Sequence, residues 1–152
     1  MKIDIFYHDK FKFSFEKDLS AIYLDRLKSI PKSIISSINC KKINTKELTK
    51  IITESHKKSF LIFLDEKGEN LSSTNLSELI FTKVDKNLIF FIGSTDGFNH
   101  EILKYADLAL SLGKMTFTHS FALIILLEQI YRSATIKMNH PYHRESYEII
   151  FC

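Results

Sequence analysis

Residues 60–64, FLIFL, are five apolar residues in a row. Residues 87–92, NLIFFI, follow the same pattern after the first position. Strands that are covered on both faces read as continuous apolar runs, whereas strands with one solvated face alternate between apolar and polar residues. The two stretches therefore predict central strands of a parallel sheet that has a layer of helices on each side.

Strand and helix patterns alternate on either side of these two stretches. Three further strands are predicted at residues 2–7, 33–40 and 106–112. Helices are predicted at 15–30, 45–56, 73–81, in a short segment ending near residue 105, and at 119–136. Loops are predicted at 65–70, 93–97 and 113–118, and the tail 137–145, which holds Pro141, is predicted to be irregular. This order predicts one α/β domain over residues 1–152, with a mostly parallel sheet and helices on both faces.

The composition narrows the class of protein. The 152 residues are 45% hydrophobic and 26% charged, which excludes intrinsic disorder and allows a sizeable core without disulfide or metal. The longest apolar run, 121–127, is far shorter than the roughly 20 residues that cross a bilayer. The N-terminus is too highly charged for a signal peptide, and Cys40 and Cys152 are predicted to be free thiols. We therefore expect a cytoplasmic protein with no membrane association.

Charge is distributed unevenly along the chain. Residues 1–59 carry 13 Lys and Arg against 7 Asp and Glu, whereas residues 60–152 carry 8 against 11. A basic half suits an anionic partner such as RNA, because lysine and arginine neutralise phosphates. A solvated, lysine-rich surface explains the charge equally well by itself.

Common cofactor and metal motifs are absent from the sequence. Its four glycines, Gly68, Gly93, Gly97 and Gly113, form neither a dinucleotide-binding GxGxxG motif nor a P-loop. The sequence also lacks the GxSxG motif of serine hydrolases. His and Cys residues do not occur at the spacing of zinc ligands, so no metal is predicted.

Five short motifs lie in the second half of the chain. They are LD at 64–65, IG with a later Gly at 92–97, TFTH at 116–119, EQIYR at 128–132 and NHPYHRE at 139–145. Each one is weak alone, but together they resemble the ribosomal RNA large-subunit methyltransferase H family. Members of that family are minimal SPOUT-type enzymes that use S-adenosylmethionine to methylate a pseudouridine in 23S rRNA. The resemblance extends over nearly the full length and is strongest over residues 60–145.

The resemblance implies a deep trefoil knot in the C-terminal part of the sheet, with S-adenosylmethionine held there by backbone groups of three loops. Leu64 would contact the cofactor, and Gly93 would allow its close approach. The third loop would wrap around it with Gly113, Lys114, Met115, Thr116, Phe117 and Thr118. Leu64 and Phe117 could instead be core residues, and Gly93 an ordinary turn glycine. The family usually has Gly-Gly-Pro where this chain has Gly93-Ser94-Thr95.

The resemblance also implies that the tail lines the active site, with catalytic roles for Tyr142, His143 and Arg144. An imidazole such as His143 accepts a proton near neutral pH, and an arginine such as Arg144 suits phosphate. Glu128 and Arg132 are four residues apart on the predicted long helix. They form either an intrahelical ion pair or, by resemblance, part of the site.

The predicted helix 119–136 is apolar at 121–127, 130, 131 and 134, which is too broad for one stripe. This predicts a homodimer in which a second subunit covers the helix, as the resemblance also implies, and in which the partner completes the active site.

Residues 146–152 are an extension beyond the point where members of the family usually end. The expected function is methylation of N3 of a pseudouridine in 23S rRNA on assembled ribosomes. The alternatives are a SPOUT methyltransferase acting on tRNA and a non-catalytic ribosome-associated binding protein.

Overall fold

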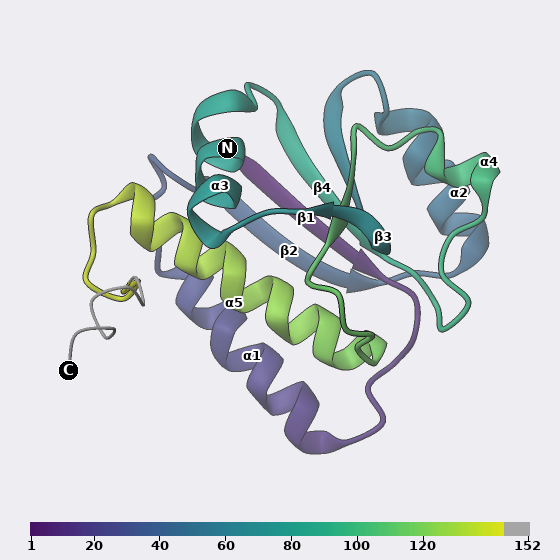
Figure 1. Ribbon diagram of the computed structural model, residues 1–152, viewed down its shortest axis with the longest axis horizontal. Coiled ribbons are helices and arrows are strands. Elements are labelled where there is room, and N and C mark those ends of the chain that lie inside the picture. Colours follow the sequence, from purple (N-terminus) through teal and green to yellow (C-terminus); the bar gives the residue numbers. More distant parts are fainter. Residues whose placement is uncertain (145–152) are drawn as a thin grey trace.

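A computed structural model describes residues 1–144 and shows one parallel sheet (Figure 1). Its strands are ordered β2-β1-β4-β3-β5, and every neighbouring pair is parallel. Their bounds are β1 Lys2–Tyr7, β2 Ser37–Lys42, β3 Ser59–Asn70, β4 Asn87–Ile92 and β5 Leu108–Ser111. The predicted α/β class and parallel sheet are confirmed, and β1 and β4 have the predicted bounds. Glu145 and the predicted extension 146–152 lie outside the described residues.

Helices cover both faces of the sheet, as predicted (Figure 1). Helices α1 (Ser14–Lys28), α3 (Ser73–Glu78) and α5 (His119–Lys137) lie on one face, and α2 (Thr45–Ser55) and α4 (His100–Leu103) lie on the other. Strand β4 contributes side chains to a hydrophobic core on each face of the sheet. Leu88 and Phe90 belong to the first core, which lies under α1, α3 and α5, and Ile89 and Phe91 belong to the second core, on the opposite face. This division explains the continuous apolar sequence of β4, because successive side chains of a strand point to opposite faces.

Strand β3 is longer than the sequence predicts. The predicted loop 65–70 is wrong, because the strand resumes pairing with β5 after an irregularity between Leu64 and Glu69. Gly68 lies within this irregular segment, where a Cβ atom would be 2.5 Å from the carbonyl oxygen of Ala109. The close approach of two backbones explains a glycine here. Charged residues in 65–69 concealed the strand, since neither continuous apolar nor alternating patterning is present.

Other boundaries also differ from the predictions: α1 ends at Lys28 instead of residue 30, and β2 extends to Lys42. β2 begins at Ser37 because Ile34 and Ile35 donate backbone hydrogen bonds to the Pro31 carbonyl at 2.9 and 3.1 Å, which forms a turn. β5 is shorter than 106–112 at both ends. Helix α3 continues as a π-helical turn at Leu79–Lys83, beyond the predicted end at 81. The short helix α4, the loop 113–118, α5 and the irregular tail through residue 144 agree with the predictions.

Most of α5 is covered by this chain itself. Leu123, Leu126, Leu127 and Ile130 are buried against the sheet and the flanking helices α1 and α3. Phe121 alone among the large apolar residues of α5 is exposed, at 49%. The apolar composition of the helix therefore does not by itself call for a second subunit, and that step of the prediction is wrong. Within residues 1–144, no helix is long and apolar enough to span a membrane.

Cys40 provides a test of packing on the first face of the sheet. Burial raises the pKa of its thiol to about 12. Because only the thiolate reacts with iodoacetamide, we expect Cys40 at pH 8 to be alkylated at least about tenfold more slowly in the native protein than in guanidinium chloride. Peptide mass spectrometry separates Cys40 from Cys152 and measures both rates. Equal native and denatured rates for Cys40 would contradict this packing.

Candidate active site

The three segments predicted to hold the cofactor follow neighbouring strands at one edge of the sheet. Phe63 pairs with Phe91 across β3 and β4, so Leu64 and Gly93 are both close to the carboxyl ends of this pairing. Leu64 pairs with Leu110 of β5, three residues before Gly113. Ligands of open parallel sheets bind at this edge, where the loops lie.

The loop 113–118 is anchored at both ends and open between them. Ser111 Oγ donates to the Gly113 carbonyl at 2.7 Å and accepts from the Gly113 N–H at 3.2 Å. Gly113 has φ +146°, which side-chain-bearing residues rarely adopt. Further along, Thr116 Oγ1 donates to Glu66 Oε2 at 2.8 Å. Residues 114–118 are all exposed, and Met115 reaches 77% exposure, so this loop offers both backbone groups and an apolar side chain to a ligand.

A cavity of about 180 Å³ lies directly before this loop. Its walls come from the end of β3, the start of α3, the end of β5 and the middle of α5. Hydroxyl and amide groups alternate there with apolar side chains, and the lining residues are Leu71, Ser72, Ser73, Leu76, Leu110, Ser111, Leu112, Ile125 and Gln129. Such a mixed lining suits a ligand with both polar and apolar parts.

Gly93 lines a different cavity, of about 130 Å³, which also contains residues of α2 and α4. A Cβ atom at Gly93 would lie 3.2 Å from the Phe98 ring, so glycine is fitted to this close packing. Leu64 lines neither cavity and packs against the first core. The structure thus places Leu64, Gly93 and the loop 113–118 at one edge, but its two cavities do not join them.

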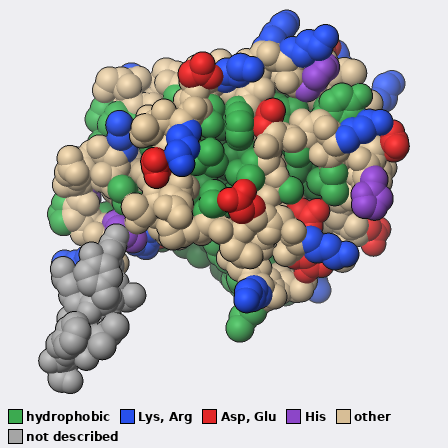
Figure 2. Space-filling view, turned by 45° about the horizontal axis from the view of Figure 1, so that its top comes forward, with side chains coloured by type: hydrophobic (Ala, Val, Ile, Leu, Met, Phe, Trp, Pro, Cys, Tyr) green, Lys and Arg blue, Asp and Glu red, His purple; other side chains and the backbone are tan. Residues whose placement is uncertain are grey.

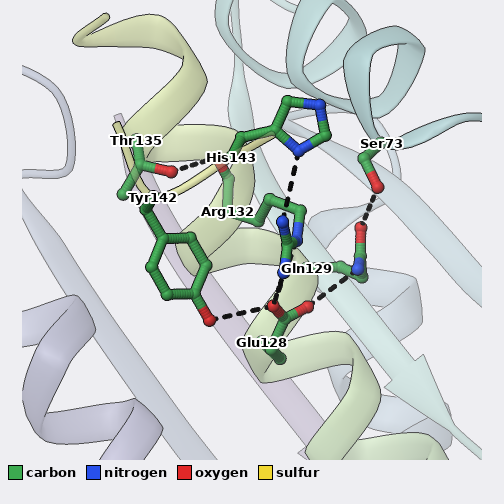
Figure 3. Close-up of polar contacts among 7 residues, drawn as sticks. All are labelled: Ser73, Glu128, Gln129, Arg132, Thr135, Tyr142 and His143. Atoms are coloured by element: carbon green, nitrogen blue, oxygen red, sulfur yellow. Dashed lines mark hydrogen bonds and ion pairs between the residues drawn. The ribbon is translucent and has the colours of Figure 1, made fainter. Parts of the chain in front are cut away.

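A polar cluster joins the tail to the middle of α5 (Figure 3). Glu128 Oε1 accepts from Arg132 Nε at 3.0 Å and from the Tyr142 hydroxyl at 3.0 Å. The Arg132 guanidinium lies 4.8 Å from the centre of the Tyr142 ring. Arg132 Nη1 also lies 3.2 Å from His143 Nδ1. Four of the five predicted catalytic residues therefore contact one another, and we call Glu128, Arg132, Tyr142 and His143 the tail cluster.

The tail cluster adjoins the cavity through Gln129. Its amide nitrogen donates to Glu128 Oε2 at 2.7 Å, and its amide oxygen accepts from Ser73 Oγ at 2.6 Å (Figure 3). Gln129 and Ser73 also line the cavity beside Leu112. The cavity next to the loop 113–118 and the tail cluster are therefore adjacent, and together they form the candidate site.

A family model described as predicted SPOUT methyltransferase matches residues 1–143. The ribosomal RNA large subunit methyltransferase H of Campylobacter jejuni subsp. doylei is 38% identical, over 95% of this chain and 100% of its own length. Its counterpart in Bartonella tribocorum is 37% identical, over 95% of this chain and 99% of its own length. The chain belongs to the ribosomal RNA large subunit methyltransferase H family of SPOUT methyltransferases.

A solved structure shows the same fold at low identity. The SpoU methyltransferase AviRb from Streptomyces viridochromogenes, in complex with AdoMet, has a TM-score of 0.50 and 10% identity to this chain. The match covers 92% of this chain and 58% of that chain. Membership of the methyltransferase H family confirms the predicted resemblance, and with it the prediction of an rRNA-modifying methyltransferase.

Within this methyltransferase, two side chains of the tail cluster have raised pKa values. Burial, followed by hydrogen bonds with Tyr23 and Glu128, raises the pKa of Tyr142, so its phenol stays protonated at neutral pH. The hydrogen bond to Glu128 raises the pKa of Arg132. Because a guanidinium only donates hydrogen bonds, its contact with His143 Nδ1 requires that this nitrogen be unprotonated. Arg144, the fifth predicted catalytic residue, is exposed next to the cluster.

Sequence reasoning missed three residues of this site. Gln129 and Ser73 connect the cluster to the cavity, and Tyr23 of α1 contacts Tyr142. Gln129 lies within the EQIYR motif, so the motif itself carried the signal. Ser73 and Tyr23 come from distant segments that only the fold brings near. Among residues 1–144, no group of three or more His, Cys, Asp and Glu side chains is arranged to hold a metal ion.

Proposed function

We propose that this protein transfers the methyl group of S-adenosylmethionine to N3 of a pseudouridine in 23S rRNA, on assembled ribosomes in the cytoplasm and without a metal. The observation that carries the proposal is the cavity lined by residues of β5, α3 and α5, which lies next to the loop 113–118 and adjoins the tail cluster through Gln129. Its donor site and acceptor site would then share Gln129 and Ser73.

The residues around the cavity fit an S-adenosylmethionine molecule. Ser72, Ser73 and Ser111 supply hydroxyls for its polar groups, and Leu112 and Ile125 supply apolar contacts. The loop 113–118 adds exposed backbone groups next to the cavity. The bound cofactor supplies a sulfonium-activated methyl group, so the protein has mainly to position the acceptor nitrogen in line with it. We also propose that this part of the chain is tied into the deep trefoil knot of SPOUT enzymes.

The tail cluster would handle the acceptor. The N3–H bond must break as the new N–C bond forms, and a positioned base assists this step. Tyr142 is protonated and Arg132 is cationic, so neither is the base. The candidate base is His143, whose Nδ1 atom lies 3.2 Å from Arg132. Arg144 is exposed and free to contact an RNA phosphate. Charged side chains of both signs are scattered over the face shown in Figure 2, so no continuous basic patch on that face marks an RNA path.

We also propose a homodimer, built on exposed apolar side chains of α1 and α5. Phe15 (61% exposed), Leu19 and Ile22 (49%) form a stripe on α1, because residues four and seven apart share a helix face. Helices α1 and α5 lie side by side, and both begin near the carboxyl end of the sheet (Figure 1). Phe121 is at the start of α5, so the stripe and Phe121 together offer a surface that a second copy would cover.

The double substitution Phe15→Ser with Ile22→Ser is expected to convert the dimer to a monomer at micromolar concentration. The substitutions replace two apolar side chains that are exposed in one subunit, and so remove the apolar contacts with the second subunit that would stabilise the interface. Sedimentation velocity measures the mass, and Lys17→Ser, at an exposed position on another face of the same helix, is the matched control. A wild-type protein that sediments as a monomer would contradict the dimer, and a double variant that stays dimeric would contradict this surface.

The function is tested by binding and by transfer. We expect calorimetry to show binding of S-adenosylmethionine, and tritiated S-adenosylmethionine to label 23S rRNA in ribosomes from a strain that lacks this protein. Labelling of bulk tRNA instead of ribosomes would support the tRNA alternative. Ribosome binding with no labelling of either RNA would support the non-catalytic alternative. The sequence feature that favours this alternative is Ser94-Thr95, which departs from the Gly-Pro of the family pattern.

A further inference from the structure

The carboxylate of Asp9 connects three segments at the carboxyl edge of the sheet. Asp9 Oδ1 lies 2.9 Å from His8 Nδ1 at the end of β1. Asp9 Oδ2 lies 3.7 Å from Nδ1 of His119, the first residue of α5. The backbone N–H of Thr95, in the turn after β4, faces this carboxylate and makes the smallest contribution to lowering its pKa. Asp9 is therefore the point where β1, the turn 93–97 and the start of α5 meet.

Two of these segments border the regions expected to hold the methyl donor. His119 comes directly after the loop 113–118, and Thr95 is two residues after Gly93. Within the turn 93–97, the Gly97 N–H donates to the Ser94 carbonyl at 2.8 Å and closes a β-turn over residues 94–97, in which Thr95 is the second residue. Thr95 is exposed to solvent. Its contact with Asp9 connects this turn to the residues that follow β1.

We propose that Asp9 is a positioning residue that holds the turn 93–97 and the start of α5 in the arrangement that binds S-adenosylmethionine. This proposal rests on the proposed function. The carboxylate acts by fixing the backbone on both sides of the donor loops, so that less conformational freedom is lost when the donor binds.

The geometry favours positioning over proton transfer. The hydrogen bond from His8, ahead of the smaller effect of His119, lowers the pKa of Asp9, so the carboxylate stays ionised and is a weak base at neutral pH. The Nε2 atom of His119 is buried and has no hydrogen-bond partner among the described residues, so it does not face an open acceptor site. An ionised carboxylate that accepts from several segments is suited to hold them together.

The experiment compares the affinity of full-length variants for S-adenosylmethionine by calorimetry. We expect Asp9→Ala to weaken binding about fivefold, the effect of losing one charge-assisted hydrogen bond next to the site. Thr95→Pro removes the donating N–H but fixes φ at a turn position where proline is favoured. We therefore expect Thr95→Pro in the Asp9→Ala background to bind more tightly than Asp9→Ala alone. Asp85→Ala, at an exposed position before β4, is the matched control and should bind like wild type.

Two further measurements separate this role from a general loss of stability. We expect the KM for S-adenosylmethionine to rise in Asp9→Ala while kcat at saturating donor stays within about twofold. Amide hydrogen exchange of residues 93–97 and 119–121 in the ligand-free protein should become faster in the same variant. Unchanged exchange, unchanged affinity, or a double variant as weak as Asp9→Ala would overturn the positioning role. A wild-type protein that binds no S-adenosylmethionine overturns the proposed function, and the donor-binding role of Asp9 with it, whatever the exchange shows.

Discussion

Glu128→Ala is expected to lower kcat/KM for methyl transfer roughly 100-fold, equivalent to about 2.7 kcal/mol of transition-state stabilisation. The Glu128 carboxylate accepts hydrogen bonds from Arg132, Tyr142 and Gln129. Its loss leaves a half-buried guanidinium and a phenol without their acceptor, and hydrogen bonds to charged groups each contribute about 1.5–3 kcal/mol. Tyr142 would then lose its hydrogen bond to α5, and Arg132, which contacts His143, would lose the carboxylate that orients it. Affinity for S-adenosylmethionine should stay within about threefold of wild type, because Glu128 does not line the cavity.

Two variants show whether the effect comes from the tail cluster. Glu128→Gln keeps an oxygen acceptor for Tyr142 but removes the charge next to Arg132, so we expect an intermediate rate. Glu101→Ala removes a carboxylate that pairs with Lys104 at 2.6 Å on the exposed surface of α4, and it should transfer at the wild-type rate. A Glu128→Ala enzyme with wild-type kcat/KM would show that the tail cluster has no part in the reaction.

Gly68→Ala is expected to lower the free energy of unfolding by about 3 kcal/mol. The new Cβ atom would lie 2.5 Å from the Ala109 carbonyl oxygen and 2.9 Å from the Leu110 nitrogen, both backbone atoms that cannot rotate away. Either β3 or β5 must move, and β5 leads directly into the loop 113–118. Thermal unfolding followed by circular dichroism should show a melting temperature lower by roughly 10 °C for a domain of this size.

The neighbouring residue supplies the control for this substitution. Glu69 is exposed and pairs with Leu110 through its backbone, so Glu69→Ala keeps the pairing and should melt within about 2 °C of wild type. A Gly68→Ala protein with the wild-type melting temperature would contradict the close approach of β3 and β5. Because both variants carry alanine but only Gly68→Ala adds a Cβ atom, the difference between them reports the contact of that atom with Ala109.

Much of the fold could be predicted because its decisive residues are buried on both faces of the sheet. The apolar runs in β3 and β4 have few other interpretations in a chain of this length. The second half of β3 could not be predicted, since Glu69 and Asn70 pair with β5 through backbone groups after an irregularity, and no side-chain pattern encodes such pairing. Similarly, the start of β2 depends on hydrogen bonds to the Pro31 carbonyl, which sequence periodicity does not reveal.

The structure brings several residues of the candidate site together, but not in the arrangement expected around one cofactor. The motif residues Glu128, Arg132, Tyr142 and His143 come together, because the tail folds back along α5. Leu64, Gly93 and the loop 113–118 were expected around one cofactor, whereas Gly93 lines a cavity of its own. Contacts such as those of Ser73 with Gln129 or of Asp9 with His119 join segments far apart in the chain. They follow from strand order, which sequence motifs do not contain.

The most direct test is mass spectrometry of 23S rRNA from cells that lack this protein, compared with cells that carry it or its Glu128→Ala variant. We predict that one pseudouridine carries an additional methyl group, at N3, in wild-type rRNA, that this methyl group is missing from the deletion strain, and that only the wild-type protein restores it fully. An rRNA with the same methylation in wild-type and deletion strains would contradict the assignment of this chain as the methyltransferase.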